Sequence, residues 1–230
     1  MTTATTLASR LLEVRARIAQ ACERAGRDPA EVTLVGVSKT QPADAVRDAV
    51  AAGLLDLGEN RAQDLLDQAE AATAAGLAPR WHFIGHLQRN KVRDVLPHID
   101  ALHSLDTMRL VEEIEQRWAA RGDRGPLPCY IEVNIAGEAQ KTGVAPSEVP
   151  ALLAAATASP ALDVVGLMTV APQVGDPEQT RPVFRALREL ASTHGLRGLS
   201  MGMTEDYPIA IEEGATIVRV GRAIFAERRT

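Results

Sequence analysis

The sequence has few aromatic residues, few cysteines and no long apolar run. Aromatic side chains make up only 3% of the 230 residues, so the stacking platforms that bind single-stranded nucleic acid are not expected. Two cysteines, Cys22 and Cys129, are too few for a disulfide framework or a cysteine-rich metal site, and we expect both to be small buried apolar groups. Because about 18 consecutive apolar residues occur nowhere, no membrane-spanning helix is predicted.

Positive charge is also in short supply. The chain carries 25 Lys and Arg against 30 Asp and Glu, which gives a net charge of −5 and disfavours non-specific binding to nucleic acid. Charged residues at positions 10, 13, 15 and 17 interrupt the N-terminal segment, so no signal-peptide core is expected there. We therefore expect a cytoplasmic protein that binds neither nucleic acid nor membranes.

The sequence does show ordinary globular composition, with 46% apolar and 24% charged residues. A length of 230 residues suits one domain of the α/β-barrel type, and we predict a single domain spanning residues 1–230.

Short apolar segments alternate with longer amphipathic ones along the chain. The predicted strands cover residues 32–38, 54–57, 81–84, 101–104, 128–135, 164–170, 199–201 and 216–220. The predicted helices cover residues 6–25, 43–52, 61–75, 89–96, 107–121, 146–157, 177–194 and 204–213. This alternation predicts an α/β fold, namely a (β/α)8 TIM barrel preceded by an extra N-terminal helix. An open, doubly wound parallel sheet is the alternative.

In a barrel of this kind, function resides at the carboxyl ends of the strands and in the loops that follow them. Lys39 directly follows the apolar segment Val35–Ser38, and we expect burial to lower the pKa of its amine, as Schiff-base chemistry requires. The alternative is a lysine that turns outward just beyond the strand.

The loops after the seventh and eighth predicted strands have the composition of a phosphate site. Ser200, Met201 and Gly202 form one loop, and Gly221 and Arg222 begin the other. In many barrels a phosphate lies on these two loops, and glycine lets backbone N–H groups approach its oxygens. An imine-forming amine opposite a phosphate anchor is the arrangement that pyridoxal 5'-phosphate (PLP) requires.

Two histidines, His82 and His86, flank the end of the third predicted strand. No third ligand stands at a metal-binding spacing, so a metal site is not expected. We include His82 among the residues of the cofactor pocket.

Seven motifs together closely resemble the YggS/PROSC family of PLP-binding, PLP-homeostasis proteins, and they follow one another in order between residues 32 and 225. They read VGVSKTQP (35–42), GENRAQD (58–64), WHFIGHLQRNK (81–91), IEVNIAGEAQKTG (131–143), GLMTV (166–170), LSMGMTED (199–206) and VRVGRAIF (218–225). The resemblance implies a fold-type III barrel, similar to the N-terminal domain of alanine racemase.

The resemblance also implies roles for individual residues. Lys39 matches the lysine that forms the internal aldimine with PLP, while Ser200 and Gly221 match positions that hold the phosphate, with Arg222 beside the latter. Arg219 matches the arginine that faces the pyridine nitrogen. Because a guanidinium remains protonated, it leaves that nitrogen unprotonated and makes the ring a weaker electron sink.

Three further positions follow from the same comparison. Asn60 matches the asparagine of the GEN motif that lines the pocket, and Lys141 matches a second family lysine. His86 departs from the proline that many members carry at this position, and it adds a titratable group near the predicted site.

Two functions from different classes are compatible with these motifs. The first is a PLP carrier in intracellular PLP (vitamin B6) homeostasis, with PLP-dependent apo-enzymes as candidate recipients. The second is an amino-acid racemase or other PLP enzyme. We favour the non-catalytic carrier, and expect a monomer, because racemases of this fold need a second domain with a catalytic tyrosine. The only tyrosines, Tyr130 and Tyr207, are not obvious second bases.

A third possibility is a phosphate-binding barrel enzyme without PLP. In that case Lys39 would serve as the Schiff-base lysine of a sugar-phosphate aldolase.

Overall fold

Eight parallel strands form a closed barrel in the computed structural model, which describes residues 6–39, 41–138 and 140–225. Each strand pairs with the next one in the chain, and β8 pairs with β1. The strands are β1 (Thr33–Val37), β2 (Asp56–Glu59), β3 (Arg80–Phe83), β4 (Ala101–Leu105), β5 (Leu127–Glu132), β6 (Leu162–Met168), β7 (Gly198–Ser200) and β8 (Ile217–Val220). The predicted TIM barrel is therefore confirmed, while the single domain predicted for 1–230 extends beyond the described residues at both ends.

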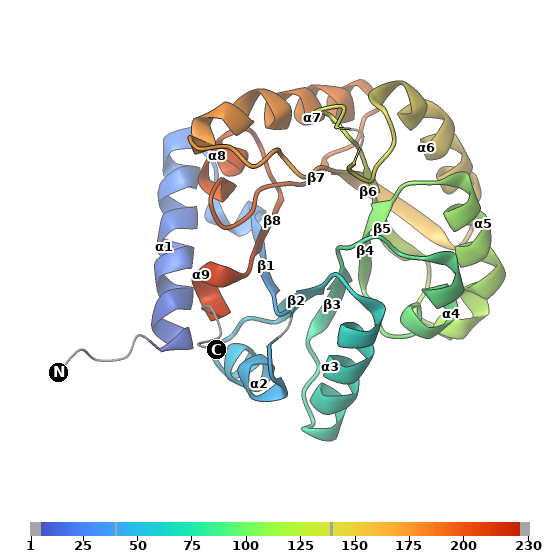
Figure 1. Ribbon diagram of the computed structural model, residues 1–230, viewed down its shortest axis with the longest axis horizontal. Helices are drawn as coiled ribbons and strands as arrows, with labels where there is room; N and C mark the ends of the chain where they lie inside the picture. Colours follow the sequence, from blue (N-terminus) through green and yellow to red (C-terminus); the bar gives the residue numbers. More distant parts are fainter. Residues whose placement is uncertain (1–5, 40, 139, 226–230) are drawn as a thin grey trace.

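The helices lie around the outside of this barrel (Figure 1). They are α1 (Leu7–Ala25), α2 (Ala43–Ala51), α3 (Ala62–Ala74), α4 (Val92–Val95), α5 (Met108–Arg117), α6 (Val149–Ala158), α7 (Arg181–Thr193), α8 (Tyr207–Glu212) and α9 (Arg222–Phe225). Short 3-10 turns precede or follow several of them, at Pro29–Glu31, Arg89–Lys91, Trp118–Arg121, Pro146–Glu148 and Pro177–Thr180. Across the described residues, we find no helix whose length and apolarity would let it cross a membrane.

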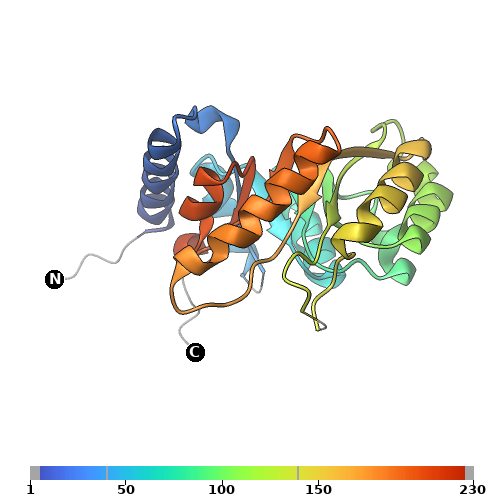
Figure 2. The same ribbon diagram turned by 90° about the horizontal axis from the view of Figure 1, so that it is seen from above.

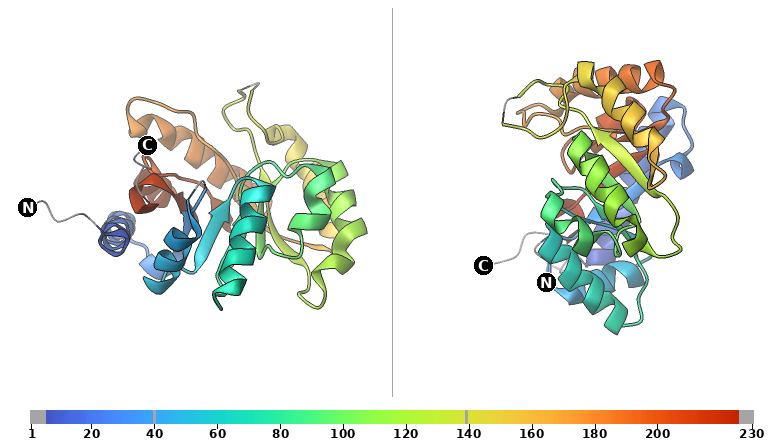
Figure 3. Two further views of the ribbon diagram at one scale, coloured as in Figure 1. Left: turned by 60° about the horizontal axis from the view of Figure 1, so that its bottom comes forward. Right: turned by 90° about the vertical axis from the view of Figure 1, so that its right-hand side faces the viewer.

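The extra N-terminal helix is present as α1. The Thr6 hydroxyl accepts a hydrogen bond from the backbone N–H of Ser9 at its start, and Gly26 ends it in the left-handed conformation at φ 64°. Its apolar face, which includes Leu11, Val14 and Ile18, is buried. Figures 2 and 3 show α1 at one end of the molecule, where it packs against α8 and α9.

Several predicted boundaries differ from the structure by a few residues, and two of these differences have clear local reasons. The second strand covers Asp56–Glu59 instead of 54–57, because the buried Leu54 belongs to the turn that follows the left-handed Gly53. The eighth predicted helix starts at Tyr207 instead of residue 204, because Asp206 Oδ1 accepts a hydrogen bond from the Met203 N–H at 2.6 Å and holds a turn there. The first of these shifts places Glu59 inside the barrel wall.

The core has two parts. Most buried apolar side chains lie in one large cluster that includes residues of both the strands and the surrounding helices. Inside the barrel the apolar cluster is small and consists of Val35, Tyr130, Met168 and Ile217. Buried polar residues of the strands, described below, occupy much of the remaining interior.

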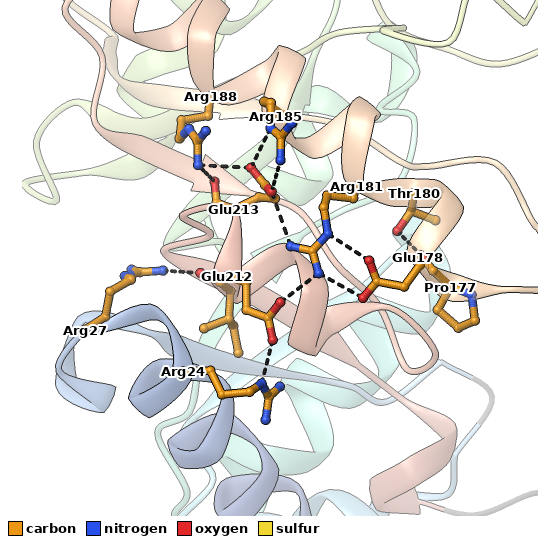
Figure 4. Close-up of polar contacts among 11 residues, drawn as sticks. Arg24, Arg27, Pro177, Glu178, Thr180, Arg181, Arg185, Arg188, Glu212 and Glu213 are labelled. Atoms are coloured by element: carbon orange, nitrogen blue, oxygen red, sulfur yellow. Dashed lines mark hydrogen bonds and ion pairs between the residues drawn. The ribbon is translucent and has the colours of Figure 1, made fainter.

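A network of ion pairs joins α1, α7 and α8 on the outside of the barrel (Figure 4). Glu213, whose side chain is only 5% exposed, contacts Arg181, Arg185 and Arg188 of α7 at 3.3, 2.9 and 3.0 Å. Glu212 bridges Arg181 at 2.8 Å and Arg24 of α1 at 2.7 Å. The network therefore fixes the end of α8, the helix that follows the loop after β7.

We expect Glu213→Gln to lower the free energy of unfolding by roughly 1–3 kcal/mol, because it leaves three arginines without their shared carboxylate. Urea denaturation measures this change. The control is Glu113→Gln, which removes the partner of Arg117 in a pair with side-chain exposures of 47% and 21% and should change stability by about 0.5 kcal/mol or less. Equal effects of the two variants would contradict the importance of the buried network.

Candidate functional site

Lys39 lies in the turn directly after β1, and its side chain is exposed. The expectation that Lys39 is buried is therefore wrong for this structure, while its place at the carboxyl end of the first strand is as predicted. The reason is that burial of the β1 end stops at Ser38, which is 0% exposed. Lys39 thus presents a solvent-accessible amine at the end of the barrel where strands terminate.

A buried carboxyl group lies at the neighbouring end of β2. Glu59 is 0% exposed, and its Oε1 accepts a hydrogen bond of 2.6 Å from the Ser38 hydroxyl. Its other oxygen, Oε2, is buried without a hydrogen-bond partner among the described residues. Burial raises the pKa of Glu59 to about 7, although the Ser38 hydrogen bond and the positive charge of Lys39 act in the opposite direction. Glu59 belongs to the motif GENRAQD (58–64), but its residue type and position alone predicted no role for it.

Asn60 follows Glu59 and has an unsatisfied side-chain oxygen. Its Oδ1 is buried and has no partner within the described part of the chain. The neighbouring segment must come very close, because a Cβ on Gly85 would lie 2.2 Å from the Asn60 carbonyl oxygen. Glycine at position 85 therefore lets the end of β3 pack against the turn that presents Asn60, a predicted pocket residue.

Arg219 carries its charge into the barrel interior. It lies in β8, is 3% exposed, and donates hydrogen bonds to the Ser200 hydroxyl at 2.6 Å and to the Thr169 carbonyl at 3.0 Å. Burial lowers the pKa of the guanidinium to about 10, with the nearby Glu132 and Asp206 acting in the opposite direction. The group therefore remains protonated at neutral pH.

Ser200 was expected in the loop after the seventh strand. The structure has it as the last residue of β7, with its side chain in the barrel interior. It is 0% exposed, and its hydroxyl is held between Arg219 Nη1 and His103 Nδ1, the latter at 2.7 Å. This hydroxyl thus contacts two protein groups, and the contact of Ser200 with a PLP phosphate stays a prediction. His103, which sequence reasoning did not select, is 0% exposed.

His82 also lies deeper in the barrel than a pocket residue at the carboxyl ends. Its Nδ1 is 2.9 Å from His103 Nε2, and its Nε2 is 3.1 Å from Asp56 Oδ1. It lines a cavity of about 320 Å³ formed largely by the first residues of the strands, including Thr33, Asp56 and Arg80. His82 is therefore connected to Arg219 through His103 and Ser200.

The loops after β7 and β8 meet near the end of β1. Gly202 adopts φ 90°, and a Cβ there would lie 2.5 Å from the Cβ of Ala210, so glycine is needed for packing against α8. The side chain of Met201 is part of the outer core and does not line the interior. A Cβ on Gly221 would lie 3.2 Å from the carbonyl oxygen of Val37, which places this loop beside the strand that leads to Lys39.

Arg222 connects the two loops. It follows Gly221 at the start of α9, and its exposed guanidinium forms an ion pair of 3.1 Å with Glu205. The first N–H groups of a helix have no partner within the helix, so the start of α9 offers backbone donors beside this cation.

The opposite side of the rim is acidic. Glu132 ends β5 and accepts a hydrogen bond from the Thr142 hydroxyl at 2.7 Å, while His86 lies 3.1 Å from Asp106. Lys141 contacts Glu138 at 2.5 Å and donates to the Val170 carbonyl oxygen at 3.3 Å. Among residues 6–39, 41–138 and 140–225, we find no group of three His, Cys, Asp or Glu residues that could hold a metal ion.

Comparisons with known proteins agree with this architecture. The family model described as the N-terminal domain of alanine racemase matches residues 10–229. A pyridoxal phosphate homeostasis protein from Pseudomonas aeruginosa is 44% identical over 226 residues, which cover 97% of this chain and 96% of that protein. This chain belongs to the pyridoxal phosphate homeostasis protein family.

Solved structures place the family member in the same fold. PipY of Synechococcus elongatus, solved with PLP bound, is 31% identical with a TM-score of 0.82, and the match covers 96% of this chain and all (100%) of that one. Alanine racemase from Corynebacterium glutamicum is 16% identical with a TM-score of 0.63, over 94% of this chain and 61% of the enzyme. The second likeness concerns the fold alone.

The buried carboxyl group of this family member predicts a pH-dependent stability. Because the folded-state pKa of Glu59, about 7, lies above the ordinary value of 4.5, its stabilising protonated form is lost as the pH rises from about 4.5 through 7. We expect the free energy of unfolding to fall by on the order of 3 kcal/mol over this range through Glu59. Glu59→Gln should abolish that part of the slope.

Urea denaturation between pH 4.5 and 8 measures this slope. The matched control is Glu70→Gln, which removes the same charge from an exposed position of α3 and should leave the slope as in the parent chain. A Glu59→Gln variant with the parent's pH dependence would contradict the assigned shift.

Proposed function

We propose that this chain binds PLP at the carboxyl ends of β1, β2, β7 and β8 and acts as a carrier in PLP homeostasis. The observation that supports this most strongly is the position of three groups on adjacent strands. They are the accessible Lys39 amine after β1, the Gly221 loop after β8, and the Arg219 guanidinium that β8 buries inside the barrel. The 44% identity to a protein named for PLP homeostasis supports the same conclusion.

The residues present fit the chemical groups of PLP. Asn60 Oδ1 and Glu59 Oε2 are buried without partners among the described residues, so each has capacity for a ligand or for water. Glycine at position 221 leaves the backbone at the start of α9 accessible beside the Arg222 cation, which suits a phosphate. When bound, PLP supplies an aldehyde that reacts with an amine and a ring that withdraws electrons.

In this proposal Lys39 holds the cofactor covalently. Its amine condenses with the aldehyde of PLP, a C=N double bond forms, and one water molecule leaves. Glu59 is a buried acid whose charge interacts with that of Lys39. Since the pKa of Glu59 is about 7, it can exchange a proton near neutral pH, and Lys39 already interacts with its charge.

The environment of Arg219 favours binding over sustained catalysis. A protonated guanidinium that faces the ring nitrogen leaves that nitrogen unprotonated. The ring is then a weaker electron sink. Racemisation also requires a second base. The Tyr130 ring packs against His103 inside the barrel at 4.8 Å, and Tyr207 is 0% exposed, with its ring under Arg17 at 5.3 Å.

The same proposal includes the oligomeric state, the cellular compartment and the partners of the protein. We infer that residues 1–230 act as one domain, as a monomer in the cytoplasm, and that PLP-dependent apo-enzymes are its recipients. The two cysteines, both free and buried, suit a reducing compartment.

Covalent attachment is tested by borohydride reduction of the PLP-loaded protein, followed by peptide mapping. The sequence contains three lysines, Lys39, Lys91 and Lys141, so the map has few alternatives. We expect one reduced PLP on Lys39, none after Lys39→Ala, and an unchanged adduct in the control Lys91→Ala. Finding the principal adduct on Lys141 or Lys91 would refute the assignment.

The carrier and racemase functions differ in how fast amino acids lose their α-proton. We expect the PLP-loaded protein to exchange the α-protons of L-alanine with deuterated water slowly, with rates close to those of free PLP. Proton NMR of the α-position measures this exchange, and Lys39→Ala serves as the background. Exchange at rates of roughly 1 s⁻¹ or more, typical of enzymes, would favour the racemase.

A further inference from the structure

A continuous chain of polar side chains crosses the barrel interior from the amino end of β2 to Arg219 in β8. Its successive members are Arg219, Ser200, His103, His82 and Asp56, which come from five different strands. The successive contacts measure 2.6, 2.7, 2.9 and 3.1 Å. Each member except Asp56 is less than 9% exposed.

The acceptor end of the chain is fixed by Asp56. Burial alone would raise its pKa, but hydrogen bonds from His82 and Arg80 outweigh that effect and lower the pKa to about 2. Arg80 holds both carboxylate oxygens, at 2.7 and 2.6 Å. Asp56 is therefore an anion that only accepts, so His82 Nε2 must carry the proton in their hydrogen bond.

The hydrogen positions on His82, His103 and Ser200 can be worked out starting from Asp56. Burial, reinforced by the charge of Arg219, holds the pKa of His103 well below its ordinary value, so His103 is a neutral imidazole. In the arrangement that we infer for the His82–His103 contact, His82 Nδ1 accepts and His103 Nε2 donates. His103 Nδ1 is then an acceptor, and the Ser200 hydroxyl must donate to it.

The donor end is fixed by Arg219. A guanidinium has no acceptor, so its contact with Ser200 is a donation to the hydroxyl oxygen. Ser200 is thereby free to use its own hydrogen toward His103. Every hydrogen bond then points in one direction, from the cation to the carboxylate.

We propose that Asp56, His82, His103 and Ser200 are positioning residues that hold the Arg219 guanidinium in one orientation through this directed chain. Because its hydrogen bonds all point the same way, the chain presents an oriented acceptor oxygen to a cation that would otherwise be expensive to bury. The role of Arg219 toward PLP rests on the proposed function, whereas the chain itself is a property of the cofactor-free protein.

The cofactor-free protein provides the first test. Long-range nitrogen–proton NMR distinguishes the protonated from the unprotonated nitrogen in each of the five histidines, with His82→Gln and His103→Gln used for assignment. We expect both His82 and His103 to carry hydrogen on Nε2 alone. A proton on Nδ1 of either residue would overturn the directed chain.

The second test measures PLP binding and the absorption maximum of the bound cofactor. We expect His103→Phe to weaken PLP binding roughly tenfold or more and to shift the absorption, because the Ser200 hydroxyl that accepts from Arg219 loses the acceptor that orients it. Since a larger ring can prevent folding, Asp56→Asn tests the far end of the chain, with a smaller change in the same direction. A folded His103→Phe protein with the parent's affinity and spectrum would overturn the proposal.

Asp100→Asn is the matched control. Asp100 lines the same cavity as Asp56 and would lose the same charge, but it binds the Trp81 N–H and Arg124 instead of His82. It should leave PLP affinity within about twofold of the parent value, and equal effects of Asp56→Asn and Asp100→Asn would count against the chain. If the parent protein takes up no PLP, the proposed function fails, while the NMR result still decides the chain.

Discussion

The burial of one positive charge, that of Arg219, is the constraint on which the interior of this barrel depends. A guanidinium that is 3% exposed needs acceptors for its hydrogens and negative charge nearby, and few places inside a barrel provide both. Ser200 and the Thr169 carbonyl supply the acceptors, while Glu132 and Asp206 supply nearby charge. Ser200, which accepts from Arg219, needs a hydrogen-bond partner of its own. His103, His82 and Asp56 supply the successive partners. This explains why much of the space inside the barrel holds hydrogen-bonding groups instead of layers of branched aliphatic side chains.

Closure of the barrel is what brings the accessible amine and the buried cation together. Lys39 and Arg219 are 180 positions apart in the sequence, yet β1 and β8 are paired, with Val35 in register with Arg219. The closure requires close backbone approaches elsewhere, for example between β6 and β7, where a Cβ on Gly166 would lie 2.0 Å from the Gly198 carbonyl oxygen. The ion pairs of Glu212 and Glu213 hold α8 against its neighbours and so support the loop after β7 from outside. The proposed PLP site thus depends on packing at positions far from the cofactor itself.

The sequence was sufficient to predict the eight strands, the barrel, the extra helix and the rim positions of Lys39 and Gly221. These features follow from apolar periodicity and from strand ends, which are local properties. It was not sufficient to predict that Ser200, His82 and His103 face inward and contact one another. Whether a strand residue faces inward, and which inward residues meet, depends on the stagger of the closed sheet, to which the local pattern is insensitive. The exposure of Lys39 was not predicted because an apolar strand sequence does not show at which residue burial ends. The second strand was predicted to start at Leu54, too early, because a loop residue can be as buried as a strand residue.

The directed chain has a consequence for how this interior can change through mutation. Five side chains on five strands each satisfy a neighbour, so an apolar replacement at one position leaves a buried donor or acceptor at the next. Replacements at several positions together remove donors along with acceptors, and such combinations can be better tolerated than their parts. The effects of mutations here are therefore expected to be strongly epistatic, and substitutions in the barrel interior should accumulate in correlated groups, unlike those on the outer helices.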